Sequence, residues 1–145
     1  MTIACDKIFA KLRVLDEYLA HLGELRSIDK QDFLKEYRAY GTAEHYLHLS
    51  IEVLLDVARL LTIVYQLPRP EDPSAAFHIV HERGILNDDL LTALAGVNSF
   101  RNILIHEYET VEMERVYQYL QENLNQFTEF KHQVLRFLKE HPIPS

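Results

Sequence analysis

The sequence predicts an all-α fold, in the form of an antiparallel bundle of four to five principal helices. Apolar residues recur at alternating spacings of three and four, which is the period of a helix with one buried face. The 145 residues include only four glycines and five prolines, and the alternating β-branched stretches typical of strands are absent. With 48% hydrophobic residues, residues 1–145 are expected to form a single domain with one core.

The first two helices are expected within residues 5–40. An apolar seam predicts a first helix that ends near Gly23. Its members are Cys5, Ile8, Leu12, Leu15, Leu19 and Leu22. Asp29 is expected to cap a second helix that runs to Tyr40, with a kink or a break at Gly41–Thr42.

A long third helix should follow as far as Tyr65. The segment 67–73 contains three prolines, which cannot continue a helix, and it therefore predicts a surface loop. A short fourth helix is expected to start at Asp72 or Ser74 and to end at Gly84.

The last two helices enclose the most informative stretch of the chain. Asn87 can cap the fifth helix, and a single final helix is expected from about Val111 to Glu140. The apolar residues of the fifth helix are Leu90, Leu91, Leu94, Val97 and Leu104. Near its end, residues 101–108 read Arg-Asn-Ile-Leu-Ile-His-Glu-Tyr.

This stretch places a cation, an amide, an imidazole and a phenol on one rim of the fifth helix. Asn102 and His106 are four residues apart, and Arg101 and Tyr108 are seven apart, so a regular helix gives each pair a shared edge. The guanidinium suits phosphate, and the imidazole can take and give a proton near neutral pH. These groups suffice for metal-free RNA cleavage, which needs a base for the 2′-hydroxyl, a cation for the phosphorane and an acid for the leaving oxygen.

The spacing Arg-x4-His-x-Tyr, with Asn directly after the Arg, resembles the signature of the HEPN superfamily and specifically its HepT branch. The wider phrase from Val97 to Tyr108 is similar to that branch almost residue for residue, and residues 43–56 also resemble it. No departure from the motif occurs at its four polar positions. The resemblance extends across the chain and implies a HEPN-like helical fold.

The resemblance also implies a function, that of a ribonuclease toxin in a toxin–antitoxin pair. The partner would be a minimal nucleotidyltransferase of the MntA type, and the substrate would be RNA, such as tRNA or mRNA. Arg101 and His106 would be catalytic, with Asn102 in support. Tyr108 would be the hydroxyl that the partner AMPylates to silence the toxin. No metal or cofactor is implied.

One motif per chain predicts a homodimer. A single imidazole cannot easily act as base and acid on opposite sides of one phosphate, whereas two copies of His106 across a two-fold axis can divide the roles. HEPN ribonucleases, which the chain resembles, share this arrangement. The expected product carries a 2′,3′-cyclic phosphate.

The residues alone leave two other functions open. In the first, the chain is a noncatalytic nucleotide- or substrate-binding subunit of a nucleotidyltransferase pair, and Arg101 and His106 hold a phosphate without cleaving it. In the second, it is a structural helical adaptor, whose polar residues satisfy the last carbonyls of the helix while Tyr108 packs its ring on the core.

Several other polar residues are further candidates for site residues. Histidines three apart can share a helical face, but no third ligand lies nearby in sequence, so a metal site is not expected. These pairs are His45 with His48 and His78 with His81. Glu44 and Asp56 could approach the motif helix or remain surface charges, and the glutamates from Glu107 to Glu114 should favour the start of the last helix.

Composition restricts the partners and the compartment. A net charge of −7 argues against general charge-driven binding to nucleic acid, DNA included, although a local positive groove or two copies of Arg101 in a dimer could still bind RNA. Cys5 is the single cysteine, which excludes an internal disulfide. No apolar run approaches the length that spans a bilayer, so a cytoplasmic protein without membrane contact is expected.

Overall fold

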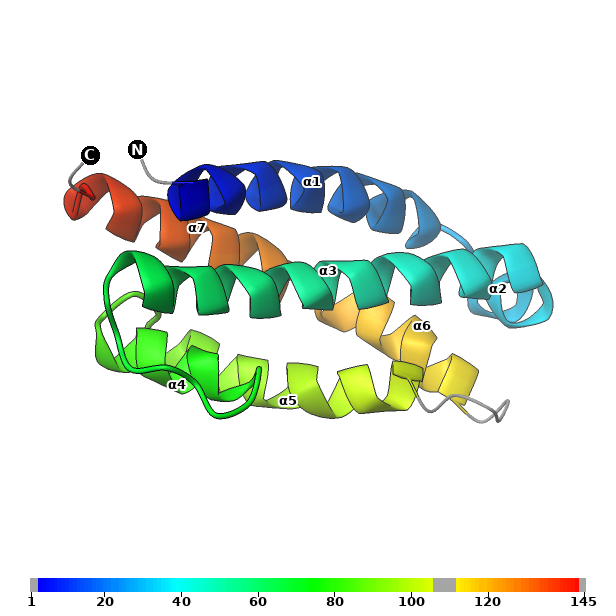
Figure 1. The fold of residues 1–145 in the computed structure, drawn as a ribbon. Helices are drawn as coiled ribbons and strands as arrows, with labels where there is room; N and C mark the ends of the chain where they lie inside the picture. Colours follow the sequence, from blue (N-terminus) through cyan, green and yellow to red (C-terminus); the bar gives the residue numbers. More distant parts are fainter. Residues whose placement is uncertain (1–2, 106–111, 144–145) are drawn as a thin grey trace.

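The computed structural model of the protein describes residues 3–105 and 112–143. Within these residues the chain forms seven α-helices and no strand, so the predicted all-α class is confirmed (Figure 1). The helices are α1 (Ile3–Leu25), α2 (Lys30–Lys35), α3 (Tyr37–Val64), α4 (Ala75–Glu82), α5 (Asp88–Ile105), α6 (Glu112–Glu122) and α7 (Leu124–Glu140).

The helices build an up-and-down bundle around α3. The direction of the chain alternates between α1, α3, α5 and the pair α6 and α7, while α2 and α4 are short helices at the connections (Figure 1). α3 contacts each of the other six described helices. The predicted antiparallel bundle is therefore confirmed, and the chain crosses it in four principal passes.

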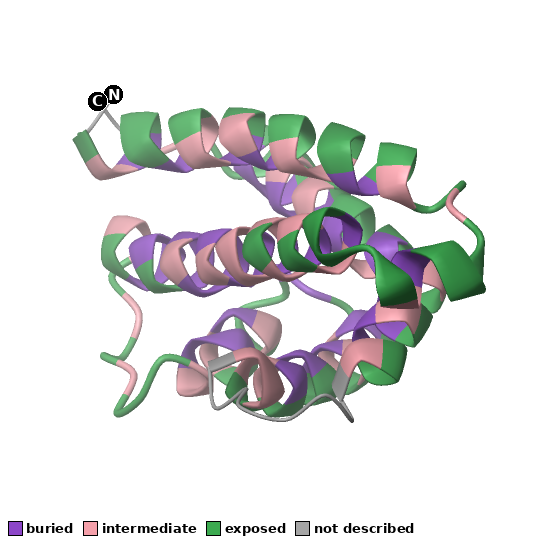
Figure 2. Cartoon of the chain, turned by 90° about the vertical axis from the view of Figure 1, so that its right-hand side faces the viewer, coloured by how far each residue is buried: buried purple, intermediate pink, exposed green. Residues whose placement is uncertain are grey.

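The core lies between the inward faces of the helices (Figure 2). α3 buries thirteen residues, including most of the apolar residues that recur along it at spacings of three and four. The largest fully buried aromatic residues are Phe33, Phe127 and Phe130. Apolar side chains from all seven helices join one buried cluster, which removes the apolar stripe of each helix from water.

The start of the long helix differs from the expectation. The predicted kink or break at Gly41–Thr42 is wrong, because α3 runs without interruption through both residues. The break lies at Glu36, whose backbone is extended and whose Oε1 accepts a hydrogen bond from the Arg38 amide at 3.1 Å. Ala39 and Ala43, on either side of Gly41, are buried. Their packing offsets the roughly 1 kcal/mol that one glycine costs a helix.

The predicted single last helix is also wrong, because Asn123 separates α6 from α7. The two helices have different neighbours: α6 contacts α2 and α3, whereas α7 contacts α5 and α3. At the break, the Gln121 carbonyl accepts a hydrogen bond from Arg26 Nη2 at 3.0 Å, and Gln121 Nε2 donates to the Arg26 carbonyl at 2.9 Å. These bonds satisfy a carbonyl that loses its partner at the helix end.

The expected loop, fourth helix and fifth-helix cap are confirmed. Asn87 Oδ1 accepts from the Leu90 amide at 2.8 Å, which caps α5. Asp72 Oδ1 accepts from Ser74 Oγ at 2.8 Å and from the Ala75 amide at 2.9 Å, which fixes the end of the loop to the start of α4. The Ser74 and Ala75 hydrogen bonds hold the pKa of the Asp72 carboxyl below its usual value, so this group stays charged.

The structure also bears on the environment of Cys5 and on the possibility of a membrane-spanning helix. Cys5 is buried in α1, and burial raises the pKa of its thiol, so it is an inert core residue. None of the described helices combines the length and apolar character needed to cross a membrane.

Candidate active site

The last described turn of α5 carries two of the four predicted site residues, Arg101 and Asn102. The turn is anchored by Phe100, whose ring stacks on Tyr119 of α6 with centroids 4.0 Å apart and planes 5° apart. Burial raises the pKa of the Tyr119 hydroxyl, so the ring remains neutral in this contact. The other two predicted residues, His106 and Tyr108, lie outside the described residues.

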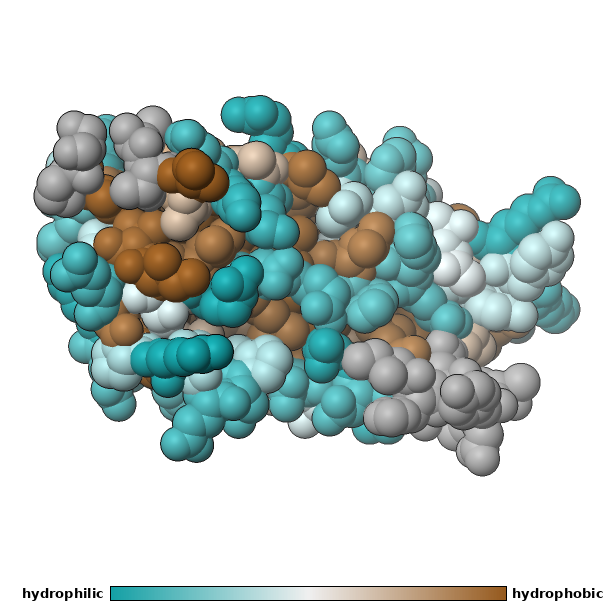
Figure 3. Space-filling view, viewed as in Figure 1, coloured by the Kyte–Doolittle hydropathy of each residue, from teal (hydrophilic) through white to brown (hydrophobic). Residues whose placement is uncertain are grey.

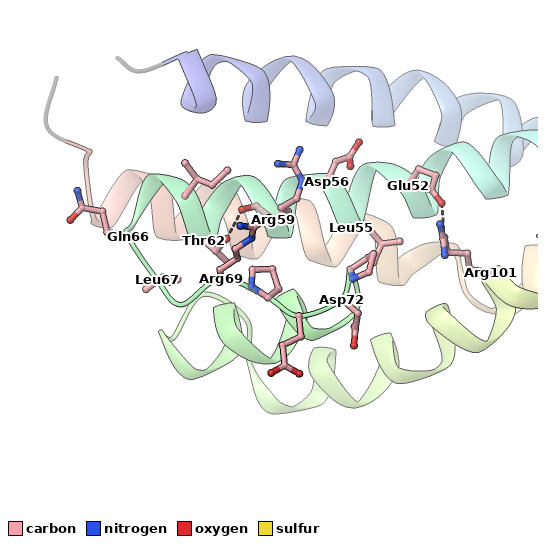
Figure 4. Close-up of a pocket in the computed structure, with 14 residues that line it drawn as sticks. Glu52, Leu55, Asp56, Arg59, Thr62, Gln66, Leu67, Arg69, Asp72 and Arg101 are labelled. Atoms are coloured by element: carbon pink, nitrogen blue, oxygen red, sulfur yellow. Dashed lines mark hydrogen bonds and ion pairs between the residues drawn. The ribbon is translucent and has the colours of Figure 1, made fainter.

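Arg101 is held by α3. Its Nε donates to Oε1 of Glu52 at 2.6 Å, and the side chains are 26% and 34% exposed, respectively (Figure 4). A charge-assisted hydrogen bond of this length fixes the plane of the guanidinium. Because the bond uses Nε, the two terminal nitrogens remain available, and neither has a partner among the residues that the structure describes. Arg101 is therefore oriented but still able to bind an anion.

His48 contacts the same carboxylate from one helical turn away. Its Nε2 lies 3.4 Å from Glu52 Oε1, at a side chain that is 43% exposed. Glu52 therefore joins an imidazole and a guanidinium at one oxygen. Asn102, one position after Arg101, is exposed, so the structure brings only Arg101 of the described motif residues onto α3.

Glu52 is not among the site residues predicted from the sequence, although α3 contains a signal that points to it. From residue 44 to residue 56 of this helix, titratable side chains occur at every fourth position, a spacing that keeps them on one side. They are Glu44, His48, Glu52 and Asp56. Glu44 and Asp56, the two acids that the sequence marks as candidates, are the outer members of this row.

Glu44 and Asp56 have different surroundings. Asp56 Oδ2 accepts from Lys11 Nζ of α1 at 3.0 Å, so its carboxylate pairs with α1 and not with the motif helix. Glu44 lines a small pocket of about 240 Å³ together with His48 and Leu104 of α5, which places it beside the last turn of α5. Of the two, Glu44 is the one that approaches the motif helix.

A groove opens next to Arg101, between the C-terminal half of α3 and the loop of residues 65–74 (Figure 4). Its volume is about 700 Å³, which falls in the range of sites for small ligands. Glu52 and Arg101 lie at one end, and Gln66 lies at the other. Arg101 therefore belongs to a cavity large enough for a nucleotide.

The histidines do not gather into a metal site in the described part of the chain, where no three metal-ligating side chains come together. His81 Nε2 lies 2.7 Å from Asp88 Oδ1 at the start of α5, whereas His78 is exposed. His45 packs its ring against Tyr46, with centroids 5.2 Å apart. The described histidines therefore contact different groups and not a common one.

A comparison with protein families gives the context for this arrangement. A model of the family described as "Ribonuclease HepT-like" matches residues 15–134, which extend from α1 into α7 and include the whole motif. The chain belongs to the HepT-like ribonuclease family. The resemblance predicted from residues 97–108 is confirmed, as is the ribonuclease class of the chain.

Two curated nucleases resemble this HepT-like chain over most of its length. The tRNA nuclease HepT of Aphanizomenon flos-aquae is 23% identical over 131 residues, which cover 90% of this chain and 89% of that protein. The mRNA nuclease HepT of Shewanella oneidensis is 22% identical over 125 residues, which cover 86% and 93%.

The fold is also shared with a solved structure, the tri-AMPylated HEPN toxin of Shewanella oneidensis in complex with an MNT antitoxin. The TM-score is 0.81 at 18% identity, and the match covers 94% of this chain and 99% of that one. The predicted HEPN-like bundle is thereby confirmed as the fold of the HepT-like chain.

Proposed function

We propose that this HepT-like chain is an endoribonuclease toxin that cleaves RNA without a metal, and that a cognate MntA-like nucleotidyltransferase silences it by AMPylating Tyr108. The observation that carries the proposal is the Glu52–Arg101 pair, which presents a fixed guanidinium to a nucleotide-sized groove. Support also comes from the nuclease names of two relatives and from the solved complex of a HEPN toxin of the same fold with an MNT antitoxin. As those relatives are named for tRNA and mRNA, both are candidate substrates.

In the proposed reaction the 2′-hydroxyl of the RNA attacks the adjacent phosphorus and the bond from phosphorus to the 5′-oxygen breaks. The products are a 2′,3′-cyclic phosphate and a free 5′-hydroxyl. His106 exchanges the protons, since imidazole serves as base and as acid near neutral pH. The terminal nitrogens of Arg101 stabilise the charge that develops on the phosphorane, and Asn102 adds an amide donor beside them.

The active unit in this proposal is a homodimer. One proton leaves the 2′-hydroxyl on one side of the phosphate while another reaches the leaving oxygen on the opposite side, so two copies of His106 share the two roles. A protein that remained monomeric at concentrations where it cleaves RNA would contradict this part of the proposal.

Glu52 is a positioning residue in this scheme, because it acts through Arg101. We expect Glu52→Ala to lower kcat by about tenfold to a hundredfold, since an unheld guanidinium samples many orientations. KM for RNA should not rise, because the change removes a negative charge near the substrate phosphate. Steady-state kinetics on one RNA substrate measures both parameters.

Two further variants separate positioning from folding for Glu52. Glu52→Gln keeps an oxygen that can accept from Arg101 Nε, so it should recover part of kcat. Glu82→Gln, which changes an exposed glutamate of α4, should match the wild type. A fall in thermal midpoint that paralleled the fall in kcat would instead assign Glu52 a purely structural role.

Incubation of purified, unmodified protein with total RNA and with tRNA in EDTA tests the proposed function. We expect cleavage that leaves 2′,3′-cyclic phosphate ends, and no cleavage by His106→Ala prepared in the same way. Products with 5′-phosphate ends, or activity that EDTA removes, would contradict the mechanism. Inactivity of protein whose mass shows Tyr108 free of AMP, together with saturable nucleotide binding, would favour a noncatalytic binding subunit.

A further inference from the structure

We propose that the groove beside Arg101 is the track for the RNA strand that flanks the cleaved phosphate, and that Arg59 and Arg69 bind its phosphates. This inference rests on the proposed ribonuclease function and assigns a substrate site to it. Arg59 comes from α3 and Arg69 from the proline-rich loop, and both residues line the groove (Figure 4).

Both arginines are available for a ligand. Arg59 and Arg69 are exposed, and in the described part of the chain neither guanidinium has a hydrogen bond or an ion pair. A guanidinium binds phosphate through a planar fork of donors. With Arg101 at the end of the same groove, three arginines line one cavity.

The groove lining contains four carboxylates beside its three arginines, but none of the four pairs with Arg59 or Arg69 in the described part of the chain. Glu52 is paired with Arg101, and Asp56 is paired with Lys11. Asp72 faces the start of α4, where the helix dipole and its hydrogen bonds stabilise the carboxylate. Glu71 is the remaining carboxylate of the lining, and it is exposed. Arg59 and Arg69 therefore remain available to phosphates although the chain as a whole carries a net charge of −7.

The spacing of the arginines separates their roles. Glu52, which holds Arg101, and Arg59 are seven residues apart on α3, which is about 10 Å along the helix axis. A stacked single strand advances about 3.4 Å per nucleotide, so Arg59 reaches a phosphate roughly three nucleotides from the one at Arg101. Arg59 also lines a shallow pocket with Lys7 and Lys11, which extends the cationic surface towards α1. Arg59 and Arg69 therefore act on binding and not on the chemical step.

The walls of the groove indicate how the strand is held. Apolar surface covers the C-terminal end of α3, and hydrophilic side chains surround it (Figure 3). Ile63 and Leu67 contribute to the lining, and Ile63 is 55% exposed. None of the described lining residues is aromatic, so the groove has no platform for base stacking. Phosphate contacts with little base preference are therefore the expected mode of binding.

The double variant Arg59→Ala/Arg69→Ala tests the track. With a decanucleotide RNA substrate, KM should rise about tenfold, because the loss of each charge-assisted contact weakens RNA binding by about that factor or less. The rise should be much smaller with a dinucleotide, which is too short to extend from Arg101 to Arg59 and Arg69. The control Arg13→Ala/Arg136→Ala removes two exposed arginines outside the groove and should match the wild type.

The salt dependence of binding gives a second readout. With a 2′-O-methyl decanucleotide, which lacks the attacking hydroxyl, the slope of log affinity against log salt should become shallower by about 1.4, or about 0.7 for each lost phosphate contact. An unchanged slope and KM would overturn the inference. Loss of antitoxin binding with RNA binding intact would also overturn it, because the groove would then be a protein interface. Wild-type protein that cleaves no RNA would instead refute the proposed function itself.

Discussion

Arg101→Ala is expected to lower kcat/KM for RNA cleavage by about a thousandfold. Removing one preorganised donor from a developing oxyanion costs about 10²- to 10³-fold, and arginines that stabilise phosphoryl transfer contribute about 10³ or more. Arg101 meets the structural condition for the large effect, because Glu52 orients it before substrate binds. Single-turnover cleavage of a defined RNA measures the loss.

Arg101→Lys separates orientation from charge. Lysine keeps the positive charge but has a single nitrogen, so it cannot hold Glu52 through one nitrogen while it presents a planar fork of two others to the phosphate. We expect it to remain well below the wild type while binding RNA nearly as tightly. Cleavage by Arg101→Ala at the wild-type rate would contradict the assignment and favour a structural role at the end of α5.

The helical periodicity of the sequence predicts most of the bundle, and the errors occur where tertiary contacts override local signals. Gly41 is a local helix breaker, but the buried alanines on both sides keep α3 continuous. Asn123 interrupts the last helix without a glycine or a proline nearby, because α6 packs on α2 as well as α3, whereas α7 packs on α5 as well as α3. Glu36 starts α3, although glutamate is not a preferred N-cap residue. Such breaks depend on neighbours that are distant in sequence.

The candidate site also combines residues that the sequence predicts with residues that only tertiary packing brings in. Arg101 and Asn102 can be identified from the motif alone, since the residue types and their spacing carry the chemistry. The partner of Arg101 comes from 49 residues earlier in the chain, and no local rule connects the two. The row of titratable residues on α3 marks the correct helix face, but only the packing of α5 on α3 selects Glu52 over Glu44 and Asp56. The groove likewise exists because the loop folds back along α3.

Tyr108→Phe is expected to make the toxin resistant to its antitoxin while leaving its ribonuclease activity in place. After incubation with the cognate nucleotidyltransferase and ATP, wild-type protein should gain the mass of AMP and lose cleavage, whereas the variant should do neither. The exposed Tyr37 provides the control, since Tyr37→Phe should still be modified and silenced. Complete silencing of Tyr108→Phe would show that the antitoxin acts at another residue or by binding alone.

The physical reason for silencing lies in the charge of the modification. In the proposed modification, the phosphodiester at Tyr108 adds a negative charge two residues from His106 and seven residues from Arg101, whose guanidinium is oriented to receive a phosphate. It can therefore compete with RNA for Arg101 as well as block the groove. If competition dominates, residual cleavage by modified protein should rise with RNA concentration, and Glu52→Ala, which loosens Arg101, should weaken the block. If bulk dominates, neither change should restore cleavage, and only removal of AMP from Tyr108 should reactivate the toxin.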